Sequence, residues 1–223
     1  MKYYKYKMNL VTINIVAIFF TAFLLILYVM LFREGEYKFG TFIYIVLWLL
    51  LHEIIHGIAF MSFPEVDNKN VTYGAKLESG IFYCMCKQRI SKKVIYTSLL
   101  APFTVIGVIT LIIAYIFNLR TLGLLSIFNI SGAIGDLMMT FLFMKMPKDI
   151  MYMDLDDCEG FTVLSKEDLS KNKYFGFKLI ESGKVTKDLA PKDFRKFNCS
   201  KPSAVILIVI FILFILSLIL EKL

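Results

Sequence analysis

Residues that carry chemistry are scarce in this chain of 223 residues, which contains two histidines, four cysteines and five prolines. So few cysteines exclude a disulfide-dense scaffold. Charged residues make up 19% of the sequence, below the roughly 25% of a soluble domain. No internal repeat or low-complexity tract is present. What abounds instead is apolar: 58% of the residues are hydrophobic and the mean hydropathy is +0.69, which predicts a membrane protein.

Five apolar runs are long enough to cross about 30 Å of hydrocarbon as helices. They cover approximately residues 8–32, 40–63, 94–118, 121–144 and 203–220. The first run lacks a small-x-small cleavage site, so we expect an anchor and not a cleaved signal. Two β-prone segments, 71–77 and 81–87, flank a turn-like sequence and predict a hairpin. The predicted fold is an all-α integral membrane protein with about five transmembrane helices, a small cytosolic hairpin and a cytosolic appendage before the last helix.

Lysine and arginine are distributed unequally between alternate loops. Three precede the first span, six lie in 64–93 and twelve in 145–202, whereas only four fall on the opposite side. The positive-inside rule therefore predicts a multi-pass protein of the cytoplasmic membrane with a cytosolic N-terminus and an external C-terminus. The net charge of +7 follows from this topology and requires no nucleic-acid partner. The predicted units are an anchor with its external loop (1–39), an intramembrane core (40–144), a cytosolic segment (145–202) and a last helix (203–223).

Both histidines lie in one motif, His52-Glu53-Ile54-Ile55-His56, inside the second span. Residues four apart share a helix face, so the two imidazoles can bind one metal ion with Glu53 beside it as a base. Across the five spans, only these three residues and Asp136 are acids or histidines. Such groups cost several kcal/mol in hydrocarbon unless they are paired. We therefore expect all four to meet at one metal site.

Asp136 is the expected third ligand. The second and fourth spans run in the same direction, and Asp136 lies at about the same depth as the histidines, at 1.5 Å per residue. The small residues 131–133 and Gly135 in the fourth span, with Gly57 and Ala59 in the second, predict a close approach of the two helices. The alternative is a carboxylate that is hydrogen-bonded between helices.

Two histidines and one carboxylate leave the fourth position of tetrahedral zinc to water, which is typical of catalytic sites. Glu53 would take the proton of this activated water and direct the water at a peptide carbonyl. The same ligands also accept iron or cobalt. Asn129 lies seven residues before Asp136, on nearly the same face. It would orient substrate or stabilise an oxyanion, or else form an interhelical hydrogen bond.

Two further clusters have plainer interpretations. Cys84 and Cys86 resemble half of a metal site, but no second Cys or His pair lies nearby, which favours ordinary strand cysteines. Asp154, Asp156 and Asp157 lack the spacing and the glycine of a calcium loop, which favours a solvated turn.

Several stretches together resemble a bacterial family of membrane zincin peptidases. They are residues 51–57, residues 83–86 with Leu100-Ala101-Pro102, and residues 129–136 followed by Met146-Pro147-Lys148-Asp149. The resemblance covers approximately residues 40–165. The family looks like a distant relative of the site-2 proteases, which cut substrates within the membrane. The resemblance implies that His52, His56 and Asp136 are zinc ligands and that Glu53 is the base. Unlike the site-2 protease pattern, Leu137 follows Asp136, and no proline lies between Asn129 and Asp136.

The sequence thus predicts an intramembrane zinc metallopeptidase whose partners are the lipid bilayer and a membrane-embedded or membrane-adjacent peptide. Two alternatives remain open: a zinc-dependent lipid or ester hydrolase, and a non-catalytic membrane protein with a structural metal.

Overall fold

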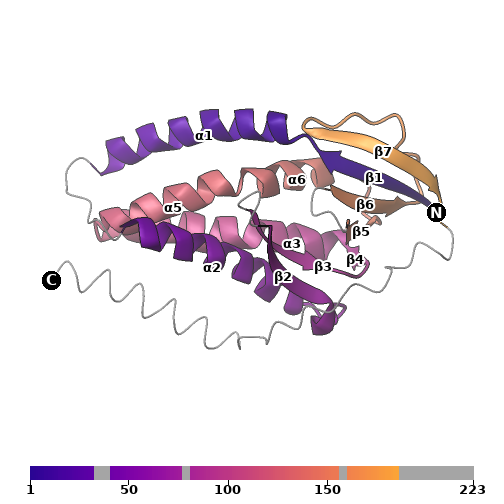
Figure 1. Ribbon diagram of the computed structural model, residues 1–223, viewed down its shortest axis with the longest axis horizontal. Helices are drawn as coiled ribbons and strands as arrows, with labels where there is room; N and C mark the ends of the chain where they lie inside the picture. The colour runs from indigo at the N-terminus through magenta and orange to yellow at the C-terminus, as the bar shows by residue number, and fades with distance from the viewer. Residues whose placement is uncertain (33–40, 77–80, 156–159, 186–223) are drawn as a thin grey trace.

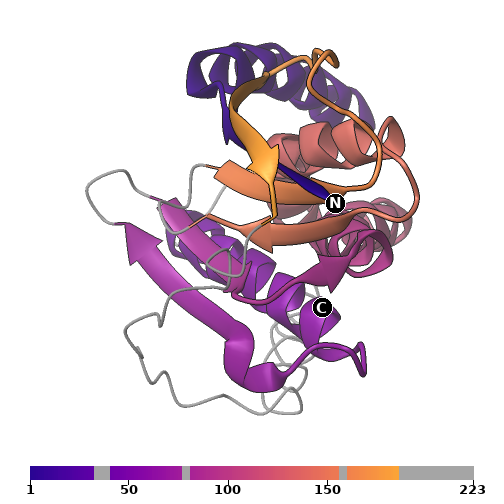
Figure 2. The same ribbon diagram turned by 90° about the vertical axis from the view of Figure 1, so that its right-hand side faces the viewer.

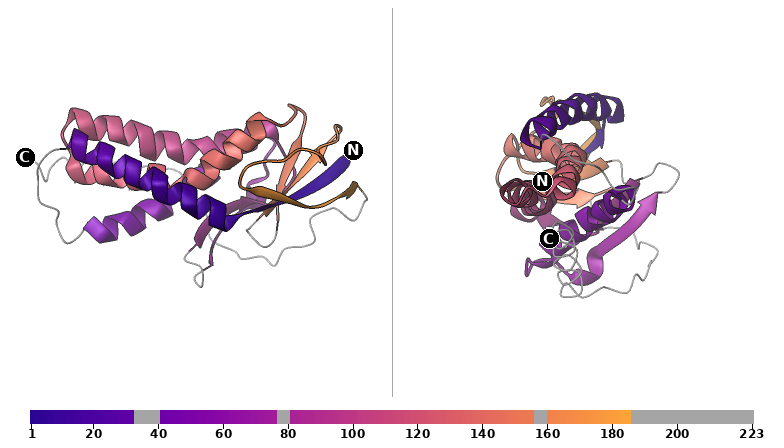
Figure 3. Two further views of the ribbon diagram at one scale, coloured as in Figure 1. Left: turned by 90° about the horizontal axis from the view of Figure 1, so that it is seen from above. Right: turned by 90° about the vertical axis from the view of Figure 1, so that its left-hand side faces the viewer.

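The structure is a computed structural model that describes residues 1–32, 41–76, 81–155 and 160–185. A bundle of helices runs along the long axis, and an antiparallel sheet closes one end of it (Figures 1 and 3). The predicted all-α fold is therefore wrong, because the protein has mixed α and β structure. The error has a physical cause, since pairing between distant strands leaves little local signal beside long apolar runs.

The helices follow the apolar runs closely. They are α1 (Leu10–Leu31), α2 (Thr41–Met61), α3 (Lys92–Pro102), the π-helical segment η3 (Phe103–Ile109), α4 (Thr110–Ile116), α5 (Arg120–Gly132) and α6 (Ile134–Met144). Within the described residues, three stretches are long and apolar enough to cross a membrane: Leu10–Leu31, Tyr44–Met61 and Lys92–Ile116. The pair α5 and α6, bent by 46°, makes a fourth if it counts as one span. The predicted span at 203–220 lies outside the described residues.

The outward faces of these helices are apolar. Along α1, large side chains such as Val11, Ile18 and Phe19 are more than two-thirds exposed. Contiguous exposed apolar surface of this extent is rare on soluble proteins but ordinary where lipid is the solvent. The arrangement is compatible with a membrane protein.

Five strands form the larger sheet, in the order β4-β5-β6-β1-β7, and all neighbouring pairs are antiparallel. They are β1 (Lys2–Met8), β4 (Ile90–Ser91), β5 (Met151–Asp154), β6 (Gly160–Ser165) and β7 (Phe177–Lys184). The N-terminal strand β1 thus lies between β6 and β7, which come more than 150 residues later in the chain (Figure 2). Three strands of the segment expected to form an appendage, β5, β6 and β7, instead share one sheet with the N-terminal strand β1.

Alternation explains why the N-terminal residues form a strand. In Lys2–Met8 the side chains of Tyr4 and Tyr6 are buried, while Lys5 lies on the opposite face and contacts Glu181 of β7 at 2.6 Å. Period-two alternation is the strand signal. The lysines of this segment also fit the positive flank of a membrane anchor, and sequence analysis therefore does not predict the strand.

The predicted hairpin is confirmed in its pairing. Strands β2 (Val71–Lys76) and β3 (Ile81–Cys86) are antiparallel, with Thr72 opposite Met85, and β2 follows a short 3₁₀ turn, η1 (Asn68–Asn70). Tyr73 fixes the hairpin to α2, because a Cβ added at Gly57 would lie 1.9 Å from the Tyr73 hydroxyl. Only glycine allows this close approach. The hairpin therefore lies over the part of α2 that carries the histidine motif.

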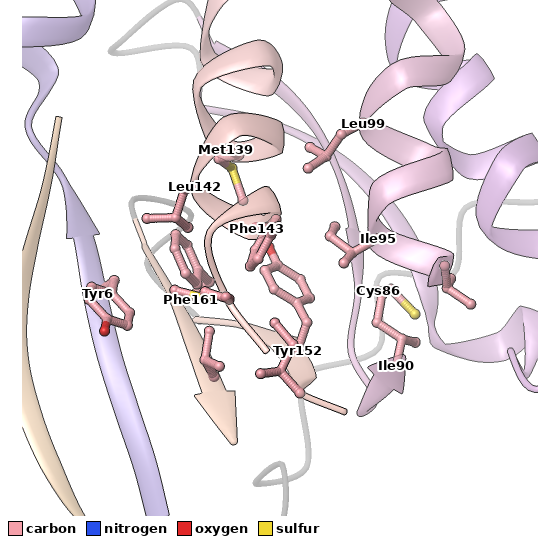
Figure 4. Packing of buried hydrophobic residues seen from close by; sticks show 14 of the residues in the cluster. Tyr6, Cys86, Ile90, Ile95, Leu99, Met139, Leu142, Phe143, Tyr152 and Phe161 are labelled. Atoms are coloured by element: carbon pink, nitrogen blue, oxygen red, sulfur yellow. The ribbon is translucent and has the colours of Figure 1, made fainter. Parts of the chain in front are cut away.

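Two apolar cores stabilise the molecule. One lies among the helices, away from the sheet, around Trp48, Ile106 and Leu122. The other joins the sheet to the helices, where Phe143 of α6 packs against both Tyr152 and Phe161, whose rings stack on each other (Figure 4). The sheet is thus packed directly against the ends of α3 and α6.

Replacing Gly160 with alanine tests whether β1 is an integral strand. A Cβ at this position would lie 2.4 Å from the Tyr6 carbonyl oxygen, so β1 and β6 would have to separate locally. We expect Gly160→Ala to destabilise the protein by about 1–3 kcal/mol, measured as thermal unfolding in detergent. Gly132→Ala is the control, because its Cβ would meet no atom within 4 Å. Equal melting temperatures for the two variants would contradict the pairing.

Candidate metal centre

The two histidines of α2 converge with Asp136 of α6. The distance from His52 Nε2 to His56 Nε2 is 3.1 Å, and Asp136 Oδ2 lies 3.1 Å from His52 Nε2 and 3.3 Å from His56 Nε2. Ligand atoms about 2.0–2.1 Å from a tetrahedral zinc ion are about 3.3 Å apart. The three atoms therefore form one face of a tetrahedron of the right size, and the group can hold a metal ion.

The other ring nitrogen of each histidine has an acceptor. His52 Nδ1 lies 2.8 Å from Asn129 Oδ1, and His56 Nδ1 lies 2.9 Å from the Ser98 carbonyl oxygen. When each Nδ1–H donates to its acceptor, the Nε2 lone pair stays free and is directed at the position that a metal ion bound by the three ligand atoms would occupy. The hydrogen bonds thus favour the tautomer that binds a metal.

Asn129, which lies on α5, also links the site to α3. Its Nδ2 donates to the Pro102 carbonyl at 3.0 Å, where α3 passes into η3, while its Oδ1 faces His52. These are the interhelical hydrogen bonds that the sequence left open as one role for Asn129. The amide therefore orients His52.

The break between α5 and α6 brings Asp136 to the site. Asn129 ends up in the last turn of α5 and Asp136 in the first turn of α6. The small residues that predicted close helix packing act differently, because a Cβ at Gly132 or Gly135 would meet no atom within 4 Å. Gly57 faces the hairpin and not the fourth span. Gly132 and Gly135 therefore lie where the fourth span bends, and they make no close contact with α2.

Glu53 lies beside the three ligand atoms in a cavity of about 200 Å³. The backbone of Cys84 on β3 forms a hydrogen bond with its carboxylate. His56 and Asp136 also line this cavity. The apolar wall comes from helices and both sheets, and includes Phe60, Phe82, Leu99, Met139 and Phe161. A carboxylate beside a three-ligand face, in a largely apolar cavity, is the arrangement expected of a general base at a metal centre.

Residues 45–151 match the family model described as "Putative zincin peptidase". This match confirms the resemblance to zincin peptidases over the segment that contains the motif, Asn129 and Asp136. No curated protein and no solved structure shows significant similarity to the chain.

Two residues just beyond this zincin segment also line the cavity, Tyr152 and Asp154 of β5. Asp154 Oδ1 accepts a hydrogen bond from the Tyr152 hydroxyl, and Oδ2 accepts one from the Cys86 backbone N–H at 3.0 Å. Burial raises the pKa of Asp154 to about 6, although both hydrogen bonds oppose the shift. Asp154 therefore fixes β5 to β3 at the cavity wall.

Sequence analysis missed both of these residues, because the acidic cluster around Asp154 favours a solvated turn. Asp156 and Asp157 of that cluster lie outside the described residues. The available signal was the alternation of Met151-Tyr152-Met153-Asp154, which places Tyr152 and Asp154 on one face of a strand.

The two cysteines of β3 behave as ordinary strand residues. Both are free thiols, and Cys86 is fully buried. Burial raises the pKa of Cys86 to about 12 and that of Cys84 well above its usual value. Both shifts disfavour the thiolate, which is the form that reacts and that binds metals.

Metal content tests the centre directly. We expect about one zinc ion per chain in protein purified without chelators, and loss of that zinc in His56→Ala and Asp136→Ala, because each variant lacks a ligand. Asn129→Ala should keep a site with roughly 10–100-fold weaker affinity, since only the orientation of His52 is lost. Elemental analysis and competition with a chelator measure both quantities.

Ser126→Ala is the matched control for Asn129→Ala. Ser126 is buried on the same helix but donates to the Leu122 carbonyl and faces Thr110. Equal zinc affinity in the two variants would contradict an orienting role for Asn129.

Proposed function

We propose that the protein is an intramembrane zinc metallopeptidase that hydrolyses a membrane-embedded or juxtamembrane peptide bond. The observation that carries the proposal is the mutual approach of the His52, His56 and Asp136 ligand atoms, all within 4.8 Å, with Glu53 beside them in a cavity. The match of residues 45–151 to a zincin peptidase family supports the same reaction class.

The chain's own residues have distinct roles in this reaction. A bound zinc ion would supply Lewis acidity and make a water molecule more acidic at neutral pH. Glu53 accepts the proton of the attacking water and delivers it to the leaving amine. Asn129 and the Ser98 carbonyl hold the imidazole rings while this happens, and the apolar wall limits access of bulk water.

The β3 strand is suited to present the substrate. Four consecutive residues of this strand, 82–85, line the cavity, and β2 pairs with one edge of β3. We propose that an extended peptide pairs with β3 beside Glu53, since strand addition holds a backbone without demanding one sequence. The competing roles of the hairpin, as a lid or a passive loop, do not require backbone pairing.

The distribution of lysine and arginine supports placing the larger sheet in the cytosol. The metal centre would then lie at the cytosolic end of the spans, because strands β5 and β6 line its cavity. In this orientation, a substrate helix that unwinds at the cytosolic surface reaches the centre first.

A lipid or ester hydrolase is the second candidate. The apolar wall around Phe60, Leu99 and Met139 favours it, because an acyl chain fits such a surface. The reaction would use the same zinc centre and Glu53, so candidate peptides and labelled lipids must be offered to the same purified protein. A solely structural metal is the third candidate, which the next variant separates from both hydrolases.

Glu53→Gln should abolish hydrolysis and retain zinc. The amide has nearly the same shape but cannot accept the proton, so we expect a loss of at least about 10²–10⁴-fold in turnover of a candidate membrane peptide. Zinc content, measured on the same samples, should stay near one per chain. Activity equal to that of the wild type would refute the catalytic assignment and leave a structural metal.

Phe82→Pro tests pairing along β3. Proline removes the backbone N–H and cannot take part fully in strand pairing, so cleavage should fall at least tenfold while zinc content is unchanged. Phe82→Leu keeps the N–H and serves as the matched control, with activity near that of the wild type. If the two variants are equally impaired, the side chain matters and not backbone pairing.

A further inference from the structure

A second hollow, of about 270 Å³, lies apart from the metal centre. It is formed by α6 and by the loop between β6 and β7. Its lining residues are Met138, Phe141, Leu142, Lys145, Tyr174 and Phe175. None of them lines the cavity at the metal centre, so the hollow has no assigned role in hydrolysis.

The loop that forms one wall is held in a defined turn. Gly176 has a φ of +81°, which favours glycine, and Tyr174 bridges to Phe177 across it. The Gly176 carbonyl accepts a hydrogen bond of 2.8 Å from the Asn9 backbone N–H, at the start of α1. These contacts hold Phe175 at the tip of the turn, where it is 72% exposed.

The turn lies at the level where two apolar helices end. Leu10, the first residue of α1, follows Asn9 directly, and α6 ends at Met144. Phe141 and Met144 on α6 are 61% and 58% exposed. Phe175 therefore adds an exposed apolar side chain next to those of α6, since it lines the same hollow as Phe141. In membrane proteins, Trp and Tyr are enriched at the boundary between hydrocarbon and headgroups, and Tyr174 lines the hollow beside Phe175.

The charged side chain that lines the hollow is positive. It belongs to Lys145, and Lys171 and Lys173 are exposed in the same loop as Phe175. The loop also carries two acids, Glu167 and Asp168, of which Asp168 forms an ion pair with Lys2. Ammonium groups above an apolar wall match a phospholipid, whose phosphate lies above its acyl chains. The hollow is smaller than the roughly 300–1,000 Å³ of pockets for drug-sized ligands, so it fits only part of a lipid.

We propose that this hollow binds an anionic phospholipid of the surrounding bilayer. The phosphate contacts Lys145, the upper part of an acyl chain lies against Phe141 and Phe175, and the rest of the lipid stays in the membrane. The bound lipid fixes the larger sheet to the membrane surface at the junction of α1, α6 and β7. This role is independent of the proposed peptidase activity.

A tryptophan introduced at position 175 reports on the contact. The chain has one tryptophan, Trp48, so Phe175→Trp is made with Trp48→Phe, and the protein is placed in single-protein nanodiscs. Emission should shift to the blue and be quenched by phospholipids brominated on the acyl chains. Ile180→Trp is the control, because Ile180 is 51% exposed on β7 and does not line the hollow. Should Trp48→Phe impair folding, difference spectra against wild-type protein with Trp48 retained give the same comparison.

The headgroup is tested by dilute brominated phosphatidylglycerol or phosphatidylcholine in a neutral lipid background. A single lysine near an anionic surface contributes enough for about a fivefold preference, so phosphatidylglycerol should quench the Phe175→Trp variant at about one-fifth the mole fraction. Lys145→Gln should remove this preference, whereas Lys166→Gln, at an exposed lysine paired with Asp149, should keep it.

Two results would overturn the proposal. In the first, the Phe175→Trp variant emits at as long a wavelength as the Ile180→Trp variant and is quenched equally by aqueous acrylamide. This result would mean that the turn faces water or binds a protein partner instead of lipid. The other is equal quenching by the two lipids, unchanged by Lys145→Gln.

Discussion

The arrangement of the helices depends on hydrogen-bond partners for two buried imidazole rings, those of His52 and His56. An unpaired polar group in such surroundings costs several kcal/mol, so each ring nitrogen must meet a partner. Asn129 and the Ser98 carbonyl take the Nδ1 atoms, and Asp136 meets both Nε2 atoms. These contacts join α2 to α3, α5 and α6. The helix arrangement and the metal centre are therefore consequences of one hydrogen-bonding requirement.

The helical irregularities of the protein gather around this network. Asn129 and Asp136 flank the bend between α5 and α6, and the Pro102 carbonyl that Asn129 reaches begins a π-helical segment. Such breaks release backbone groups from regular hydrogen bonding and redirect side chains, which is why they are frequent at functional sites. The bend directs two side chains, Asn129 of α5 and Asp136 of α6, at one ring, His52, and the Pro102 carbonyl at the start of the π-helical segment accepts a hydrogen bond from Asn129.

The larger sheet is part of the site and not an appendage to it. Its strand β5 supplies Tyr152 and Asp154 to the cavity wall, β6 supplies Phe161, and the end of β1 supplies Met8. Asp154 also binds the backbone of β3, which links the sheet to the hairpin that carries Cys84 beside Glu53. The cavity at the candidate metal centre is therefore lined by residues from the helices, the hairpin and the sheet.

The sequence by itself determined the local features: the apolar helices, the hairpin strands, and the spacing that puts His52 and His56 on one face. It also singled out Asp136, because a lone carboxylate in a long apolar run needs a partner. Only the tertiary structure decided that Lys2–Met8 pairs with residues 160–165 and 177–184, that the fourth apolar run bends, and that Asp154 faces the cavity. Helical periodicity is a short-range property that sequence displays, whereas strand partners and cavity walls depend on contacts between distant residues, from Cys86 and Asp154, 68 positions apart, to Lys2 and Lys184, 182 positions apart.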